Sequence, residues 1–118
     1  MSTSGERLYD LSLIEEMACG DEDFMKELAE TFLSSVPPVV DSMLQYSMNQ
    51  EWIKMADAAH NLKSNIDTLQ IMSIRDEIRI IESNGKNLVD LDVTHQLVEK
   101  VAKILNTAMD QIKVQFKL

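Results

Sequence analysis

The stretch that decides the fold is residues 92–116, DVTHQLVEKVAKILNTAMDQIKVQF. Apolar residues recur in it every three or four positions, a spacing that puts side chains on one face of an α-helix. The stripe consists of Val93, Leu97, Val101, Ile104, Ala108, Ile112 and Phe116. A core-facing stripe over about seven turns needs other helices to cover it, because such a face is stable only when buried.

Residues 21–48 predict a second long helix. An apolar stripe runs from Phe24 to Met43 and keeps its phase across Pro37-Pro38. Two adjacent prolines remove backbone donors and disfavour α geometry before them, so they either kink a helix or separate two helices. Because the stripe keeps its phase, we expect one kinked helix.

Three shorter segments complete the predicted set of helices. Residues 51–69 form the third long helix, and a fourth follows Ser73 as its N-cap and ends at residues 83–85, Ser-Asn-Gly. Near the start of the chain, residues 11–18 form a short helix capped by Asp10. The apolar side of this short helix carries Leu13, Ile14 and Met17.

Composition and length agree with a helical domain. The 118 residues include only three glycines and two prolines, and good helix formers dominate. We therefore expect an all-α fold, an antiparallel four-helix bundle with a short extra N-terminal helix. One domain spans residues 1–118, with the polar residues 1–8 loosely attached.

Net charge limits the partners of the chain. The formal charge is −9 at pH 7. Such a surface repels the phosphate backbone of nucleic acids and the anionic headgroups of membranes. We expect neither as a partner.

Other features indicate a cytoplasmic protein. Cys19 is the single cysteine, so no intramolecular disulfide can form and no zinc-type cysteine cluster exists. No apolar run approaches the ~20 residues of a membrane span. The first residues lack the basic and apolar regions of a signal peptide.

The candidate functional residue is His60, in the stretch Ala58-Ala59-His60-Asn61-Leu62-Lys63-Ser64. Each residue turns a helix by about 100°, so the angle of every side chain around the third helix can be counted from His60. The core stripe lies nearly opposite His60 and consists of Met55, Ala59, Leu62, Ile66 and Leu69. The imidazole is therefore expected to point to solvent.

The neighbours of His60 favour phosphoryl chemistry. A neutral imidazole is a good nucleophile near pH 7 without special activation. Ala56 and Ser64, one turn away on either side, are too small to shield the ring. Lys63 lies close enough to offset the charge of a phosphoryl group. Asp57 or Asp67 could orient a ring nitrogen, or both could simply be solvated. The alternative is an ordinary exposed histidine with a lysine nearby.

A partner would dock around His60. Ile53 is the exposed apolar candidate on the same face, two turns upstream. The other candidate docking residues are Ala56, Asp57, Asn61, Ser64 and Asp67.

These residues resemble the signature of histidine-containing phosphotransfer (HPt) domains, approximately Ala-His-x-Leu-Lys-Gly in the third long helix of a bundle. Residues 59–64 match it except at Ser64, where the family has glycine. Gln70 stands where many members have a second glycine. The start of the second helix, Gly20-Asp21-Glu22, is also similar, and the resemblance spans roughly residues 8–116.

The resemblance implies a phosphorelay intermediate. His60 would accept a phosphoryl group from an aspartate of one receiver domain and pass it to an aspartate of another. Lys63 would stabilise the phosphate. The partners would be receiver domains of a hybrid histidine kinase or a response regulator, and these domains would bring the Mg²⁺. The chain itself would be a monomeric phosphocarrier without cofactor or metal, and not an enzyme.

Two other functions remain open. A helical adaptor could bind a partner through its acidic face without phosphoryl transfer. A dimerisation-type histidine kinase domain is disfavoured, because Asn61 and Leu62 follow the histidine where such kinases have Glu and Arg. His95, the only other histidine, is expected to be structural or solvent-facing, and no metal-ligand spacing joins it to His60.

Overall fold

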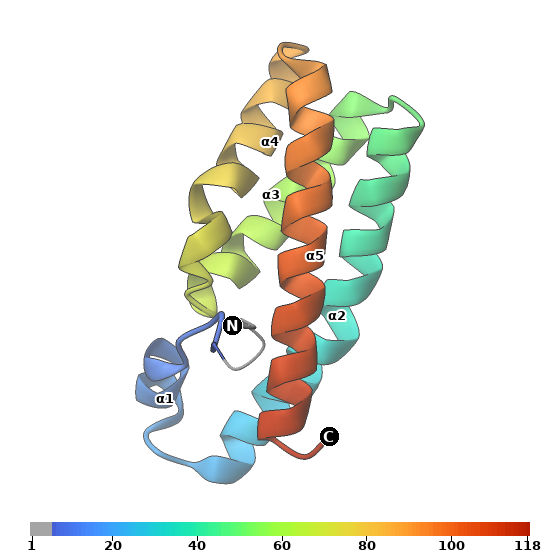
Figure 1. Ribbon diagram of the computed structural model, residues 1–118. Helices are drawn as coiled ribbons and strands as arrows, with labels where there is room; N and C mark the ends of the chain where they lie inside the picture. The colour runs from blue at the N-terminus through green and yellow to red at the C-terminus, as the bar shows by residue number, and fades with distance from the viewer. Residues whose placement is uncertain (1–5) are drawn as a thin grey trace.

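A computed structural model describes residues 6–118, and this part of the chain is helical, with no strand. Figure 1 shows its elements in order. They are α1 (Ser12–Ala18), α2 (Glu22–Met48), α3 (Trp52–Thr68), the 3₁₀ turn η2 (Met72–Ile74), α4 (Arg75–Asn87) and α5 (Leu91–Gln115). Within residues 6–118, no helix combines the length and apolar character needed to cross a membrane.

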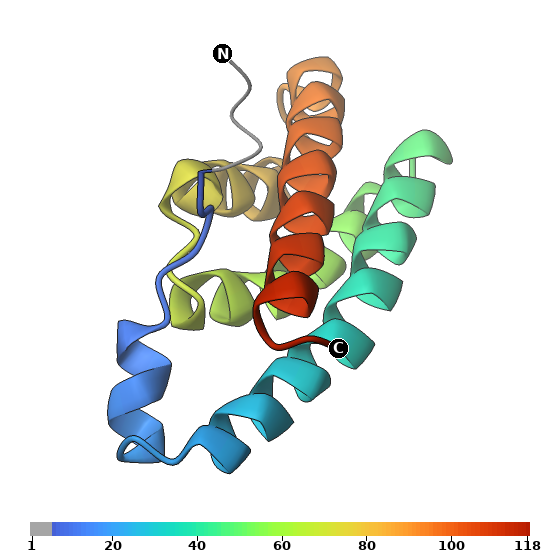
Figure 2. The ribbon, with the colours of Figure 1, turned by 60° about the horizontal axis from the view of Figure 1, so that its bottom comes forward.

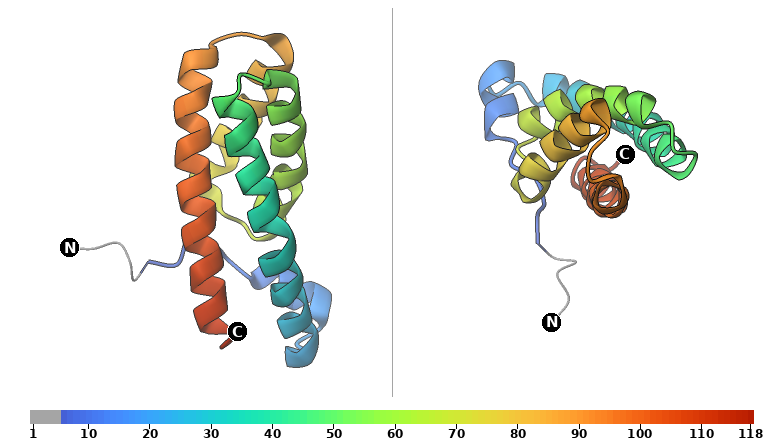
Figure 3. Two further views of the ribbon diagram at one scale, coloured as in Figure 1. Left: turned by 90° about the vertical axis from the view of Figure 1, so that its right-hand side faces the viewer. Right: turned by 90° about the horizontal axis from the view of Figure 1, so that it is seen from above.

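The four longer helices pack in a closed ring of contacts. α3 packs against α2 and α4, and α5 packs against the same two helices from the other side. The α2–α3 turn and the α4–α5 loop lie at the same end of the molecule (Figure 3). Helix α1 lies at the opposite end, beside the start of α2 (Figure 2). Fully buried side chains from all four of these helices form the core between them, among them Met43, Met55, Leu62, Ile78 and Leu105.

Helix α2 runs without a break through Pro37 and Pro38, as the phase of its apolar stripe predicted. Asp21 caps its start, since the carboxylate accepts a hydrogen bond from the backbone N–H of Phe24. Val36 and Val40, on either side of the prolines, are fully buried. Burial of this face against α3 and α5 stabilises the helix across the two prolines despite the missing donors.

The predicted stripes fail in the first turns of the helices. Phe24 in α2 is 40% exposed and Val93 in α5 is 56% exposed, whereas the next residues, Met25 and Thr94, are buried, so the core-facing side of each first turn lies one position further along the chain. The prediction for α1 is also partly wrong, since Leu13 and Met17 are exposed and Ile14 is buried. Such a short helix packs against α2 along a narrow strip only.

Helix α4 corrects two predictions. Ser73 lies in the 3₁₀ turn and caps nothing with its side chain, and α4 begins at Arg75. The predicted stop at residues 83–85 is wrong, because the helix continues to Asn87 and Leu88 adopts the left-handed conformation at its end. Gly85 serves instead as a contact point inside the helix: a Cβ there would lie 2.9 Å from the Cβ of Ala56.

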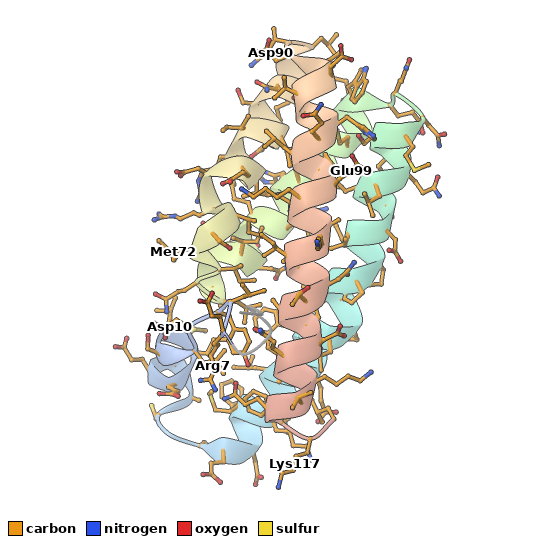
Figure 4. The ribbon with its side chains drawn as sticks, in the orientation of Figure 1. Arg7, Asp10, Met72, Asp90, Glu99 and Lys117 are labelled. Carbon is orange, nitrogen blue, oxygen red and sulfur yellow. The ribbon has the colours of Figure 1, made fainter. Side chains whose placement is uncertain are left out.

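The segment before α1 is held against α5. The backbone N–H of Leu8 donates to the Gln111 side chain at 2.9 Å, and the Tyr9 hydroxyl bonds to Gln115. Arg7 and Asp10 lie at the end of the molecule away from Asp90 (Figure 4). The expectation of a loose segment over residues 1–8 is therefore wrong for Leu8, and residues 1–5 lie outside the described part of the chain.

Candidate functional site

His60 lies in the middle of α3 on its outward side. Its side chain is 60% exposed, whereas Met55, Leu62 and Ile66 on the opposite side of the helix are fully buried. The exposure expected from the helical angles is confirmed. Ala58 and Ala59, immediately before the histidine, are buried on either flank of α3.

Glu82 of α4 holds the imidazole ring. Its Oε2 lies 2.7 Å from Nδ1 of His60, and only 11% of the Glu82 side chain is exposed. An ionised carboxylate only accepts hydrogen bonds, so Nδ1 carries the ring proton and donates it. The lone pair of the neutral ring is then on Nε2, away from the carboxylate. Of the two alternatives for Asp57 and Asp67, orientation of the ring or simple solvation, the first is wrong at Nδ1, because Glu82 of the neighbouring helix supplies this group.

Glu82 also binds two lysines. Nζ of Lys63 donates to Oε1 at 2.9 Å, and Nζ of Lys86, one turn further along α4, donates to Oε2 at 3.0 Å. The hydrogen bond from Lys63 is the largest cause that lowers the pKa of Glu82 to about 2, and those from Lys86 and His60 add to it against the cost of burial. The carboxylate is therefore ionised at neutral pH. We call His60, Lys63, Glu82 and Lys86 the histidine cluster.

Close packing of α3 on α4 brings Glu82 to His60. Gly85 is one turn after Glu82 in α4, and Ala56 is one turn before His60 in α3. A Cβ on Gly85 would lie only 2.8 Å from the backbone oxygen of Trp52. The absence of this Cβ lets the helix axes approach, and the next turn of each helix then meets at the histidine.

This packing removes Ala56 from the candidate docking surface. Ala56 is 0% exposed against α4, so a partner cannot touch it, and its prediction as a docking residue is wrong. Helical angles from a single helix cannot reveal that a second helix covers part of the same face. The small side chain serves the helix–helix contact instead.

Of the remaining candidate docking residues, some have exposed side chains and one forms an ion pair with a neighbouring helix. Ile53 is 52% exposed, and Ser64 is exposed with its hydroxyl turned to the backbone oxygen of Asn61. Asp57 and Asn61 are exposed and border a hollow of about 340 Å³ between α2 and α3. Asp67 is engaged, because it pairs with Arg79 of α4 at 2.6 Å.

Gln70 adopts a conformation that glycine favours. Its φ is 50°, in the left-handed region, and it directly follows Leu69, the C-cap residue of α3. The side-chain amide donates to the backbone oxygen of Asp10, which ties this turn to the segment before α1. The glycine expected here from the resemblance would remove strain, and Gln70 replaces it with a contact.

His95 has a different environment from His60. Its Nδ1 lies 2.6 Å from the hydroxyl of the buried Ser47, and so it links α5 to the end of α2. A carboxylate oxygen of Glu99 lies 3.9 Å from Nε2. The contact with Ser47 fits the first of the two roles expected from the sequence, structural or solvent-facing. In residues 6–118, no three histidine, cysteine or acidic side chains are grouped so as to hold a metal ion.

Sequence reasoning missed Glu82 and Lys86. Their four-residue spacing is typical of an ion pair on a helix surface. It gives no indication of a contact with His60, which lies 22 residues before Glu82 in the sequence. Comparisons of the chain with protein-family models, curated proteins and solved structures gave no match.

Proposed function

We propose that the chain is a histidine phosphotransfer protein, in which His60 accepts a phosphoryl group from a receiver-domain aspartate and passes it to another receiver. One observation carries the proposal: an exposed imidazole whose Nδ1 is held by an ionised carboxylate, beside two ammonium groups. This geometry leaves Nε2 as the nucleophile, and the two ammonium groups bonded to Glu82 beside the ring offer positive charge to the incoming anion.

The proposed transfer conserves the ring proton. The Nε2 lone pair attacks phosphorus while the bond from phosphorus to the aspartyl oxygen breaks, and its electron pair leaves with the aspartate carboxylate. The proton on Nδ1 stays, held by Glu82, so the phosphorylated ring is cationic. On transfer to the next aspartate, the electrons of the N–P bond return to Nε2 and the neutral imidazole is restored.

The fold supports the same role. We take the ring of α2, α3, α4 and α5 to be the antiparallel bundle of an HPt domain, which presents the histidine from a rigid helix. The receiver would supply Mg²⁺ and the acidic pocket, so this chain acts as a phosphocarrier and not as an independent enzyme. With such partners, we expect the chain to act in the cytoplasm and as a monomer.

The decisive experiment is transfer from a phosphorylated receiver. Acid-labile, base-stable label should appear on the wild-type chain and be absent from His60→Gln. His95→Gln is the matched control, since it removes the other histidine and should leave transfer unchanged. Label that survives His60→Gln, or no label with any receiver of the source organism, would overturn the proposal.

Lys63 gives a graded test. Lys63→Ala should slow transfer without abolishing it, because the nucleophile and its Glu82 partner remain. A partner that binds the wild type and His60→Gln equally and triggers the same response would instead favour the adaptor function.

A further inference from the structure

Lys86 shares a carboxylate oxygen with the histidine. Its Nζ and the Nδ1 of His60 both bond to Oε2 of Glu82, at 3.0 and 2.7 Å. The ammonium group of Lys86 is therefore on the same side of the ring as the bond that orients it. Lys86 reaches this place from α4, whereas Lys63 reaches the other oxygen from α3.

The two lysines differ in their freedom to move. The Lys86 side chain is 53% exposed and that of Lys63 is 30% exposed, while Glu82 beneath them is nearly buried. Lysine is a mobile point charge on a flexible stem, so an exposed one can change partners at little cost. Glu82 cannot follow, because it is held in the α3–α4 contact.

The charge of the histidine cluster changes on phosphorylation. At rest, two ammonium groups and one carboxylate leave one net positive charge beside the neutral ring. A phosphoryl dianion on Nε2, with a cationic ring that keeps its Nδ1 proton, would bring the cluster to neutrality. The strongest new attraction for an ammonium group is then the phosphoryl group, and Glu82 remains paired with the cationic ring.

We propose that Lys86 is a second phosphoryl-binding residue, which leaves Oε2 of Glu82 for an oxygen of the phosphoryl group on His60. This inference rests on the proposed function and extends it to a residue on a different helix from the histidine. Glu82 acts as the resting partner of the cation, which keeps the ammonium group beside the ring before the phosphoryl group arrives.

Two other charged side chains on α3 do not fit this role. Asp57, on α3, is an exposed carboxylate and would repel the phosphoryl group. Lys54, also on α3, pairs with Glu51 and lies over the ring of Tyr46. Among the described residues that form the histidine cluster, the cations are Lys63 and Lys86.

The test uses phosphoramidate, which transfers its phosphoryl group to an imidazole nitrogen and releases ammonia, so that no receiver is needed. The ³¹P resonance of the phosphorylated chain is followed against pH, because an adjacent ammonium group favours the dianion and lowers the midpoint. Lys86→Ala should raise this midpoint by about half a pH unit, as for the loss of one exposed ion pair. Lys63→Ala should shift it in the same direction.

Lys103→Ala is the matched control. Lys103 is exposed on α5, whose main packing partners are α2 and α4, so its loss removes one charge at a distance from the site. Lys86→Gln repeats the test with a longer side chain. A midpoint in both Lys86 variants equal to that of Lys103→Ala would overturn the inference.

Failure of the two proposals can be told apart. If receivers transfer label to His60 but the Lys86 variants keep the control midpoint, only the inference about Lys86 is wrong. If no receiver transfers label but the midpoint moves as expected, the phosphoryl site stands and the relay function is wrong.

Discussion

Replacement of Gly85 by alanine tests how the site is built. The new Cβ would lie 2.8 Å from the Trp52 oxygen, 2.9 Å from the Ala56 Cβ and 2.9 Å from the Met55 methyl. Met55 can move its flexible end, but the other two atoms belong to the backbone of α3 or are fixed directly to it. Helix α4 must therefore shift away from α3.

The magnitude follows from two opposing terms. Overpacking a buried contact costs about 1–3 kcal/mol, whereas glycine to alanine inside a helix gains about 1 kcal/mol. We expect a net loss of about 1 kcal/mol in the free energy of unfolding, which lowers the melting temperature by about 4 °C. Because Glu82 is one turn away on the same helix, the shift should also weaken its bond to His60.

Two assays measure these effects. Urea unfolding gives the change in stability, and ¹⁵N NMR of the His60 ring reports the loss of the Nδ1 hydrogen bond. Ser83→Ala is the control, because Ser83 is exposed on the same helix and gains helix propensity without a clash. If Gly85→Ala stabilises the protein by about 1 kcal/mol and leaves the His60 ring resonances in place, the reasoning about the α3–α4 contact is refuted.

Three further predictions concern stability. The pKa of Glu82 falls from 4.5 to about 2 on folding, so its contribution is complete above about pH 4.5 and is lost as pH falls towards 2. Through this group, the free energy of unfolding of the wild type should fall by at most about 3 kcal/mol between neutral pH and pH 2. Urea unfolding at pH 7 and at pH 3 should show a smaller loss of stability for Glu82→Gln than for the wild type. Asp21→Ala removes the cap of α2 and should cost about 1 kcal/mol in thermal unfolding, while Asp21→Asn retains the acceptor and most of that stability. Leu62→Ala, at a fully buried position below the histidine, should cost about 2–5 kcal/mol in urea unfolding, and a loss under 1 kcal/mol would contradict its place in the core.

Helical periodicity predicted the elements well because it is a local property. The stripe through Pro37-Pro38 predicted one helix, and α2 is one helix. A different local signal misplaced the end of α4, since Ser-Asn-Gly at residues 83–85 resembles a helix stop in sequence. Only the packing of α3 against α4 shows that this glycine is needed for a close contact.

The sequence by itself determined the helices, the outward direction of His60 and the nearby cation Lys63, because all three follow from positions within one helix. The tertiary structure decided which groups complete the site. Glu82 and Lys86 reach His60 from α4, and Ala56 is covered by the same helix. These contacts depend on where two helix axes cross and how closely they approach, and that is set by side-chain volumes on both helices together.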